Sequence, residues 1–552
     1  MMVGRRARGR AATAAILRPL STGPGGLVDL WDGKATTSDI SRDDALAKAR
    51  APSLRRVQGC YKVPFGIDPK RHTGDPLLVR DRARGEGDGT RQRDKRKTQD
   101  KKKGNGYMKR TRSAVALAGA ALAVTAMLGT AMLGSPAAVS ASTNAKTTIT
   151  WWTWTSNPKT VIANFEKAYP NISVPVPPVY GSGATFYAKL TTAVAGGTGP
   201  CVTQVEYSEL PQYIAAHDLV NIAQYVSSYR KDFPAWVWQQ VSQGSAVYAV
   251  PEDIGPIGLM YQPAVLKKYN LPVPATWSQF ASDAAALHKA NPSMYLEPFV
   301  LNDPSILESL WWQAGARPFQ LLPNGTWKID VAGTIEQQVT NFWAKLVKQG
   351  LAPVDNDFTT DWTHHVAQDK YAAMVGAAWG PDYVISSNLA SNSTEEWAVT
   401  QLPQWTAGAH ATANWGGSTN AVTKDCPSQD VKDAALFAAY INTSKSGIAI
   451  DEESGAQGGR GLFPAASARA SVPQFNATVP HFTGNINALY SQYAAQVVTN
   501  WVWSPFDAEF RSFMSTELAS AVAGKQTWSQ ALQSVESQLV SYAKSAGYSV
   551  ES

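Results

Sequence analysis

Strand-like and helix-like segments alternate between residues 146 and 207, and this alternation restricts the fold more than any other feature of the sequence. Lys146–Trp154 alternates β-branched and aromatic residues, which is typical of a strand. Pro158 stands in the first turn of an expected helix, and the pattern then predicts strand, helix and strand up to Tyr207. This rhythm predicts a parallel sheet with helices on both faces.

A second α/β region follows without a linker. It includes a helix over Trp277–Lys289, for which Thr276 is a suitable N-cap, and a buried strand over Tyr371–Ala378. A further strand is predicted over Asn414–Thr423 and a helix over Val431–Asn442. No internal repeat and no Pro- or Ser-rich linker divides these regions. We therefore expect two α/β lobes that are interleaved by several chain crossings.

Residues 108–141 have the parts of an export signal. Three basic residues precede an apolar run over Ala114–Leu133, and the small residues Val139-Ser140-Ala141 form a cleavage site. The apolar run approaches the length of a membrane-spanning helix, but it is rich in Ala, and no basic stop-transfer segment follows it. The sequence thus predicts a cleaved signal peptide and an exported protein, either extracellular or at the cell surface or in the periplasm. No cysteine stands directly after the cleavage site, so a lipid anchor has no evident attachment point.

Residues 1–107 differ in composition from the rest of the chain. They hold 25 Lys and Arg against 12 Asp and Glu and show no sustained periodicity. Such a segment buries too little apolar area to offset the entropy of ordering it. We expect a disordered basic leader, or translated sequence upstream of a true start at Met108; a nucleic-acid-binding arm is less favoured. Although the whole chain has a net charge of +7, residues 142–552 hold 22 basic and 31 acidic residues, which argues against a nucleic-acid partner.

The chain has three cysteines, Cys60, Cys201 and Cys426, and the last two lie in the part expected to be exported. Disulfides form and persist in exported proteins. We therefore predict a bridge between Cys201 and Cys426.

Four sequence blocks carry a family resemblance. They read TITWWTWTSNPKTVIANFEKAYPNISV, GSAVYAVPEDIGPIGLMYQPAVLKKYNLPVPATWSQF, AAMVGAAWGPDYV and GLFPAASA. In this order, and behind an export signal, they resemble the family 1 extracellular solute-binding proteins, the maltose-binding type that serves ABC importers. The resemblance covers the chain from about residue 147 to residue 548.

The resemblance implies a fold like that of the type II periplasmic binding proteins, in which two α/β lobes are joined by a hinge and a ligand cleft lies between them. The expected lobes are residues 146–255 plus about 415–465, and residues 256–414 plus about 466–548. The resemblance further implies a monomer that captures a sugar or oligosaccharide by lobe closure and delivers it to an ABC permease in the membrane. It implies no enzymatic activity, no cofactor and no metal.

Candidate ligand contacts are aromatic and hydrogen-bonding residues at strand ends and in loops that match the cleft of the family. Sugars present flat apolar faces and rings of hydroxyls, which suit aromatic platforms and polar side chains. An open α/β sheet places ligands at the carboxyl ends of its strands. The expected contacts are Trp154, Glu206, Tyr207, Asp253, Trp311, Trp379, Trp415, Gly416, Gly417 and Arg460.

Other functions stay open at this point. A binding protein for peptides or polyamines is one alternative, and a polyamine site requires more carboxylates in the cleft. A secreted glycoside hydrolase is less favoured, because the resemblance implies a non-catalytic cleft. It would need Glu206 and either Asp253 or Glu252 as a carboxyl pair about 5–5.5 Å apart.

Overall fold

The computed structural model describes residues 146–551, except residues 179 and 391. All of them belong to one compact unit. The predicted leader (1–107) and signal peptide (108–141) lie outside the described residues and stay predictions. In the part of the chain that the structure describes, no helix combines the length and the apolarity that crossing a membrane requires.

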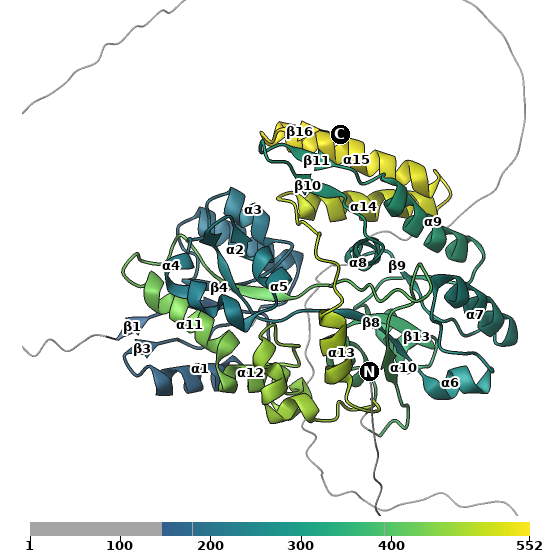
Figure 1. The fold of residues 1–552 in the computed structure, drawn as a ribbon, viewed down its shortest axis with the longest axis horizontal. Coiled ribbons are helices and arrows are strands. Elements are labelled where there is room, and N and C mark those ends of the chain that lie inside the picture. The colour runs from purple at the N-terminus through teal and green to yellow at the C-terminus, as the bar shows by residue number, and fades with distance from the viewer. Residues whose placement is uncertain (1–145, 179, 391, 552) are drawn as a thin grey trace, which may run out of the picture. The chain divides into compact units, whose positions relative to one another are not determined.

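A four-stranded sheet forms the centre of what we call the first lobe, on the left in Figure 1. Its order is β2 (Trp151–Trp152), β4 (Val202–Glu206), β15 (Ser418–Val422) and β7 (Ala249–Pro251). Strands β2 and β4 are parallel, as the alternating pattern predicts, but β15 is antiparallel to both β4 and β7. The predicted parallel pairing is therefore confirmed for β2 and β4, but the sheet is mixed, because a strand from much later in the chain pairs antiparallel between β4 and β7.

Helices from two distant parts of the chain cover this sheet. Helices α11 and α12 contact α1, and Figure 1 shows them side by side. The helices of the first lobe are α1 (Pro158–Ala168), α2 (Ala184–Ala195), α3 (Leu210–Ala215), α4 (Ala223–Val226), α5 (Ala235–Gln240), α11 (Val431–Thr443) and α12 (Lys445–Glu452). Two small strand pairs complete it: β1 (Thr147–Thr148) with β3 (Ile172–Ser173), and β5 (Ser242–Gln243) with β6 (Ala246–Val247).

A second sheet has the order β13 (Ala373–Ala377), β8 (Ile257–Tyr261) and β14 (Ala398–Thr400), and all its pairings are antiparallel. We call the elements around it the second lobe. Its helices are α6 (Pro263–Lys268), α7 (Trp277–Ala290), α8 (Ser305–Gln313), α9 (Thr334–Lys348), α10 (Thr360–Ala367), α13 (Ile486–Ala494), α14 (Asp507–Val522) and α15 (Trp528–Ser545). Its other strands are β9 (Phe299–Val300) with β12 (Val354–Asp355), and β10 (Phe319–Leu321), β11 (Trp327–Ile329) and β16 (Val550–Glu551).

The chain passes between the two sheets more than once. It leaves the first sheet after β7 to enter β8, and it returns from β14 to β15. After α12 it crosses again, because α13 contacts β8 and β14. This interleaving agrees with the absence of a linker in the sequence. The residue limits predicted for each lobe stay a prediction.

Local sequence signals explain several helix starts. The Thr276 hydroxyl accepts a hydrogen bond from the Gln279 N–H (3.2 Å), so α7 has the predicted N-cap. Helix α1 begins at Pro158, also as predicted. Asn157 precedes it in the left-handed region (φ 55°), and its amide donates to the Gly459 carbonyl (2.6 Å) instead of capping the helix. Here a contact between distant segments replaces a local cap.

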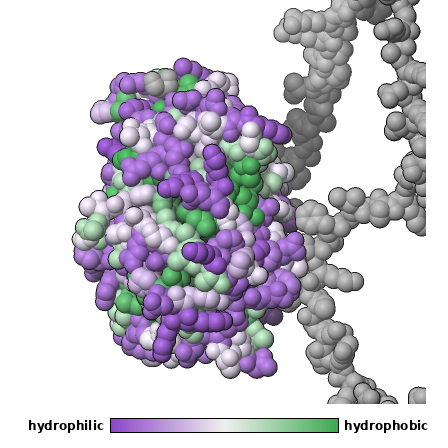
Figure 2. Space-filling view, turned by 90° about the vertical axis from the view of Figure 1, so that its right-hand side faces the viewer, coloured by the Kyte–Doolittle hydropathy of each residue, from purple (hydrophilic) through white to green (hydrophobic). Residues whose placement is uncertain are grey.

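Apolar side chains are largely inside the lobes. The fully buried residues include Trp151, Phe165 and Phe186 in the first lobe and Trp277 and Trp311 in the second. On the face drawn in Figure 2, hydrophilic residues cover most of the surface, and hydrophobic residues gather in a few patches. Burial of apolar area is the main favourable contribution to folding.

Glu297 is a buried carboxyl whose titration makes stability depend on pH. One of its oxygens accepts a hydrogen bond from the Val375 N–H in β13 (2.7 Å), and the other has no partner among the described residues. Burial raises the pKa of Glu297 to about 8. Between the pKa of an exposed Glu, about 4.3, and this value, only the folded state holds the proton. The free energy of unfolding therefore falls as pH rises, by up to about 1.4 kcal/mol per pH unit.

We expect Glu297→Gln to remove this dependence. Urea unfolding of both proteins at pH 5, 6, 7 and 8 measures it: relative to the parent, the variant gains stability as pH rises. Many other groups titrate in this range, and taking the difference between the two proteins removes their contribution. A difference that stays constant over these pH values would contradict the assignment.

Candidate functional site

A cavity of about 1060 Å³ is lined by residues of both lobes. The first lobe contributes residues from the ends of β2 and β4 and from α2, and the second contributes residues after β9, β12 and β13 and along α14. Its aromatic lining consists of Trp154, Tyr187, Phe358, Trp379, Tyr383, Trp415 and Trp503. The cavity joins wide aromatic surfaces to carboxyl groups, an arrangement suited to a ligand with both apolar faces and hydrogen-bond donors.

Two tryptophans are held in the cavity by the segments that cross between the lobes. The N–H of Trp415 donates to the Gly255 carbonyl (2.8 Å), and its indole N–H donates to the Ser305 hydroxyl (2.8 Å). The indole N–H of Trp379 donates to the Trp415 carbonyl (3.1 Å). A Cβ atom at residue 255 would lie 2.0 Å from the Trp415 carbonyl oxygen, so only glycine permits this approach. The crossing geometry thus fixes both indole rings.

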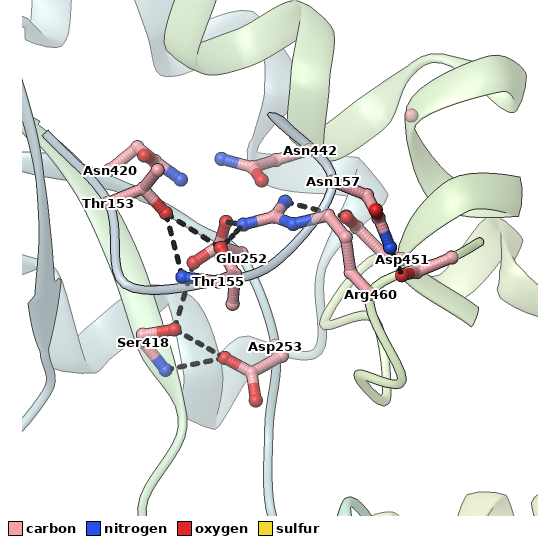
Figure 3. Close-up of polar contacts among 12 residues, drawn as sticks. Thr153, Thr155, Asn157, Glu252, Asp253, Ser418, Asn420, Asn442, Asp451 and Arg460 are labelled. Atoms are coloured by element: carbon pink, nitrogen blue, oxygen red, sulfur yellow. Dashed lines mark hydrogen bonds and ion pairs between the residues drawn. The ribbon is translucent and has the colours of Figure 1, made fainter. Parts of the chain in front are cut away.

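Asp253 lies in the same crossing region and lines the cavity. One of its oxygens accepts hydrogen bonds from the Ser418 N–H (2.7 Å) and hydroxyl (2.6 Å). In Figure 3 the second oxygen points away from Ser418, and no hydrogen bond within the described residues reaches it. Burial and the neighbouring Glu252 raise the pKa of Asp253 to about 7, against the lowering effect of the Ser418 donors. Asp253 is therefore a positioned acceptor with one oxygen left for a ligand.

Arg460 does not line this cavity, although the sequence suggested it as a ligand contact. Its guanidinium is fully buried and forms ion pairs with Glu252 (2.5 Å) and Asp451 (2.7 Å), as drawn in Figure 3. The second oxygen of Glu252 accepts from the Gln204 amide (2.6 Å) and the Ser418 hydroxyl (2.9 Å). Arg460 thereby stabilises the Glu252–Ser418–Asp253 chain on the side away from the cavity, and its terminal nitrogens donate to Glu252, Asp451 and the Thr155 hydroxyl.

Two further predicted contacts lie in the cores of the lobes. Trp311 is 0% exposed, and its indole N–H donates to Thr340 of α9 (3.0 Å), because its face of α8 packs against that helix. Tyr207 is also buried and lies behind Gly417, whose carbonyl accepts the Tyr207 N–H (3.3 Å). Trp154, Glu206, Asp253, Trp379, Trp415, Gly416 and Gly417 are the predicted residues that line the cavity together.

Glu206 and Glu209 bring carboxyl groups from the end of β4. The Tyr187 hydroxyl donates to Glu206 (3.2 Å) and accepts the Glu206 N–H (3.1 Å). Burial raises the pKa of Glu206, while Arg511 of the second lobe opposes the shift. Glu209 is paired with the Gln212 amide, and burial raises its pKa to about 8. Both carboxyls therefore hold protons more tightly than exposed ones do.

Sequence reasoning missed the carboxyls of the second lobe, Asp303 and Asp357. They follow β9 and β12, which pair in parallel, so that both residues lie at the same edge. Burial and the nearby Asp303 raise the pKa of Asp357 to about 7. The rule that ligands bind at carboxyl ends of strands identifies them once the strands are known. Each strand has two residues, however, which is too short for a recognisable sequence pattern.

Comparison with known proteins identifies the family. The family model of the bacterial extracellular solute-binding proteins matches residues 151–448, which is more than half of the chain. The chain belongs to this family. We call the cavity between the lobes the cleft from here on.

Solved structures of other solute-binding proteins share the two-lobe fold. The ABC transporter associated binding protein of Bifidobacterium animalis subsp. lactis, in complex with β-1,6-galactobiose, is 26% identical with a TM-score of 0.64, covering 74% of this chain and all of that one. The galacto-N-biose-/lacto-N-biose I-binding protein of Bifidobacterium longum is 20% identical with a TM-score of 0.65. The match covers 74% of this chain and 99% of that one. The sugar-binding protein MalE of Xanthomonas citri is 19% identical with a TM-score of 0.57, and the match covers 71% of this chain and 96% of that one.

A curated relative matches over a shorter stretch. It is an uncharacterized ABC transporter extracellular-binding protein of Pyrococcus horikoshii, 30% identical over 128 residues. The match spans 22% of this chain and 29% of the relative.

Proposed function

We propose that this solute-binding protein captures a sugar or oligosaccharide in the cleft and delivers it to an ABC permease. The observation that carries the proposal is the pairing of aromatic rings with carboxyl acceptors on both sides of one cavity. Rings suit the apolar faces of sugars, and carboxyls accept from their hydroxyls. The volume of about 1060 Å³ lies at the upper end for small-molecule sites, which favours an oligosaccharide. The disaccharides bound by the two bifidobacterial proteins support the same ligand class.

The mechanism follows from the position of the cleft. Trp154 and Glu206 come from the first lobe, and Asp357 comes from the second. A ligand contacts all three only when the lobes are close together, so binding favours the closed form. We propose that the permease recognises this form of an exported monomer, and that the cleft binds its ligand without catalysing a reaction. Release of sugar from a panel of glycosides, lost in Glu206→Gln, would show catalysis instead.

Two tryptophans two residues apart give a matched test of the cleft. Trp154 lines it, whereas Trp152 is outside it and packs on Tyr180, with 4.8 Å between ring centroids. Both side chains are half-buried. We expect Trp154→Ala to lower sugar affinity at least tenfold, which corresponds to about 1.4 kcal/mol, because it removes an aromatic platform. Trp152→Ala is expected to change the affinity less than threefold.

A thermal-shift screen of neutral and amino mono- and oligosaccharides, followed by titration of tryptophan fluorescence, measures both effects. A ligand at 100 times its Kd adds roughly 2.7 kcal/mol to the free energy of unfolding. If no saccharide raises the melting temperature, or if both variants lose affinity equally, the proposed function or its site is wrong.

A further inference from the structure

The ionisable groups that line the cleft are mostly acidic. Among the described residues, the lining contains five carboxyl side chains and one cation. The carboxyls are Glu206, Glu209 and Asp253 of the first lobe and Asp303 and Asp357 of the second, and the cation is Arg511 of α14. Carboxyl groups thus line the cleft from both lobes.

The single cation is already paired with other carboxylates. Arg511 forms ion pairs with Glu308 of α8 (3.3 Å) and with Asp507 of its own helix (3.0 Å). Both partners are almost completely buried. These carboxyls offset part of the charge of Arg511, and Arg511 also lowers the pKa values of Glu206 and Glu209 against the effect of burial. Arg460, behind Asp253, is likewise shared between two buried carboxylates.

Asp357 lines the cleft with a carboxyl group that is not fully hydrogen-bonded. Asp357 is 3% exposed, and its Oδ2 atom has no hydrogen-bond partner among the described residues. The backbone on either side is held, because Asn302 accepts the Asp357 N–H (2.9 Å) and donates to its carbonyl (3.2 Å). A buried carboxylate oxygen without a donor is costly. Asp253, which is 3% exposed, also lines the cleft with one oxygen that receives no hydrogen bond among the described residues, so a donor on the ligand would be favoured at Asp253. Phe358, the next residue, is 58% exposed beside it in the cleft.

We propose that the solute is an amino sugar, a saccharide with at least one protonated amine that the cleft carboxylates bind. This inference rests on the proposed function and names the class of sugar. An ammonium group supplies three donors and a positive charge, whereas a hydroxyl supplies one donor and no charge. A hydroxyl can also donate to the free oxygen of Asp253, but only the charged ligand in addition offsets the ionised carboxyls of the cleft. The aromatic rings remain available for the apolar faces of the sugar.

Protonation of the carboxyls makes this preference depend on pH. In the free protein the pKa values of Asp253 and Asp357 are raised to about 7 and that of Glu209 to about 8, each mainly by burial. The pKa of Glu206 is also raised, and Arg511 lowers the pKa values of both glutamates against this effect. An ammonium binds the ionised form more tightly. The preference for an amine is therefore larger at pH 7 than at pH 5, where the carboxyls are protonated.

Matched sugars test the proposal on the full chain. Isothermal titration at pH 7 compares glucose, glucosamine and N-acetylglucosamine, the corresponding galactose set, and the disaccharide chitobiose with its N,N′-diacetylated form. Spermidine serves as an amine without a sugar. In at least one set the amine is expected to bind tenfold or more tightly than its acetylated and neutral counterparts. At pH 5 this advantage falls below threefold.

Two aspartates that lie close together in the sequence, Asp357 and Asp361, provide the variant and its control. Asp357→Asn is expected to reduce affinity for the amine at least tenfold and affinity for a neutral sugar less than threefold. Asp361→Asn removes the same charge from an exposed residue of α10 outside the cleft lining and should change neither. Glu206→Gln is the second variant if the first does not fold, and it should also lose preference for the amine.

The outcomes separate this inference from the proposed function. Neutral sugars that bind as tightly as amino sugars would overturn the inference and leave sugar capture intact. Binding of spermidine without binding of any saccharide would overturn both, as would the absence of binding to every compound. An amine preference that Asp357→Asn and Glu206→Gln both leave unchanged would also overturn the assignment.

Discussion

Arg460→Met is expected to lower the free energy of unfolding by about 3–5 kcal/mol. The guanidinium is fully buried and pairs with Glu252 and Asp451, which are themselves buried. Removing the cation leaves two carboxylates in a medium of low dielectric without their partner. Urea unfolding of the parent and the variant at pH 7 measures the loss. The affinity for ligand should fall as well, because Glu252 helps to hold Ser418, the residue that positions Asp253.

An exposed ion pair gives the matched control for this result. Lys424 pairs with Asp218 (2.7 Å), and the side chains of the two residues are 43% and 13% exposed. Lys424→Met should cost no more than about 1 kcal/mol, because solvent screens surface pairs. Adding Glu252→Gln to Arg460→Met removes one uncompensated charge and is expected to restore part of the stability. Equal effects of Arg460→Met and Lys424→Met would contradict the structural role given to Arg460.

Loss of the disulfide is the second large effect. The structure bonds Cys201 to Cys426, as predicted, across a sequence separation of 225 residues. Cys201 immediately precedes β4 and Cys426 follows β15, and Val202 pairs with Val422 in the antiparallel ladder between them. The bond therefore closes the end of a strand pair that joins distant parts of the chain. Replacing both cysteines by serine should lower the free energy of unfolding by about 2–5 kcal/mol.

Denaturant unfolding of the parent and the double variant, both without reductant, measures this loss. The parent unfolded in the presence of a reductant should approach the variant. Alkylation of the denatured, unreduced chain followed by peptide mapping checks the bond itself. Modification of Cys201 or Cys426 under these conditions would disprove the bridge, and equal stability of the two proteins would disprove its contribution.

Several features of the fold and the site were predictable from local sequence. The Thr276 cap, the start of α1 at Pro158 and the alternation of strands and helices depend on neighbouring residues, whose side chains and backbone interact directly. Trp154 and Glu206 were predicted because they come at or just after the ends of strands, and Asp253 because it lies in the irregular segment expected at the hinge; all three line the cleft. The family could be recognised in the same way, since its blocks are continuous stretches of sequence.

The tertiary structure alone decided which segments meet. The sequence by itself determined the elements, their order and the aromatic and acidic residues available at their ends, because these depend on local periodicity. It did not show that β15 pairs between β4 and β7, that Trp311 faces α9, or that Arg460 is enclosed by Glu252 and Asp451. The acidic pair at Asp303 and Asp357 likewise exists only because two short strands far apart in the chain align in parallel. Strand pairing and the burial of a particular helix face are set by long-range packing, which local patterns do not encode.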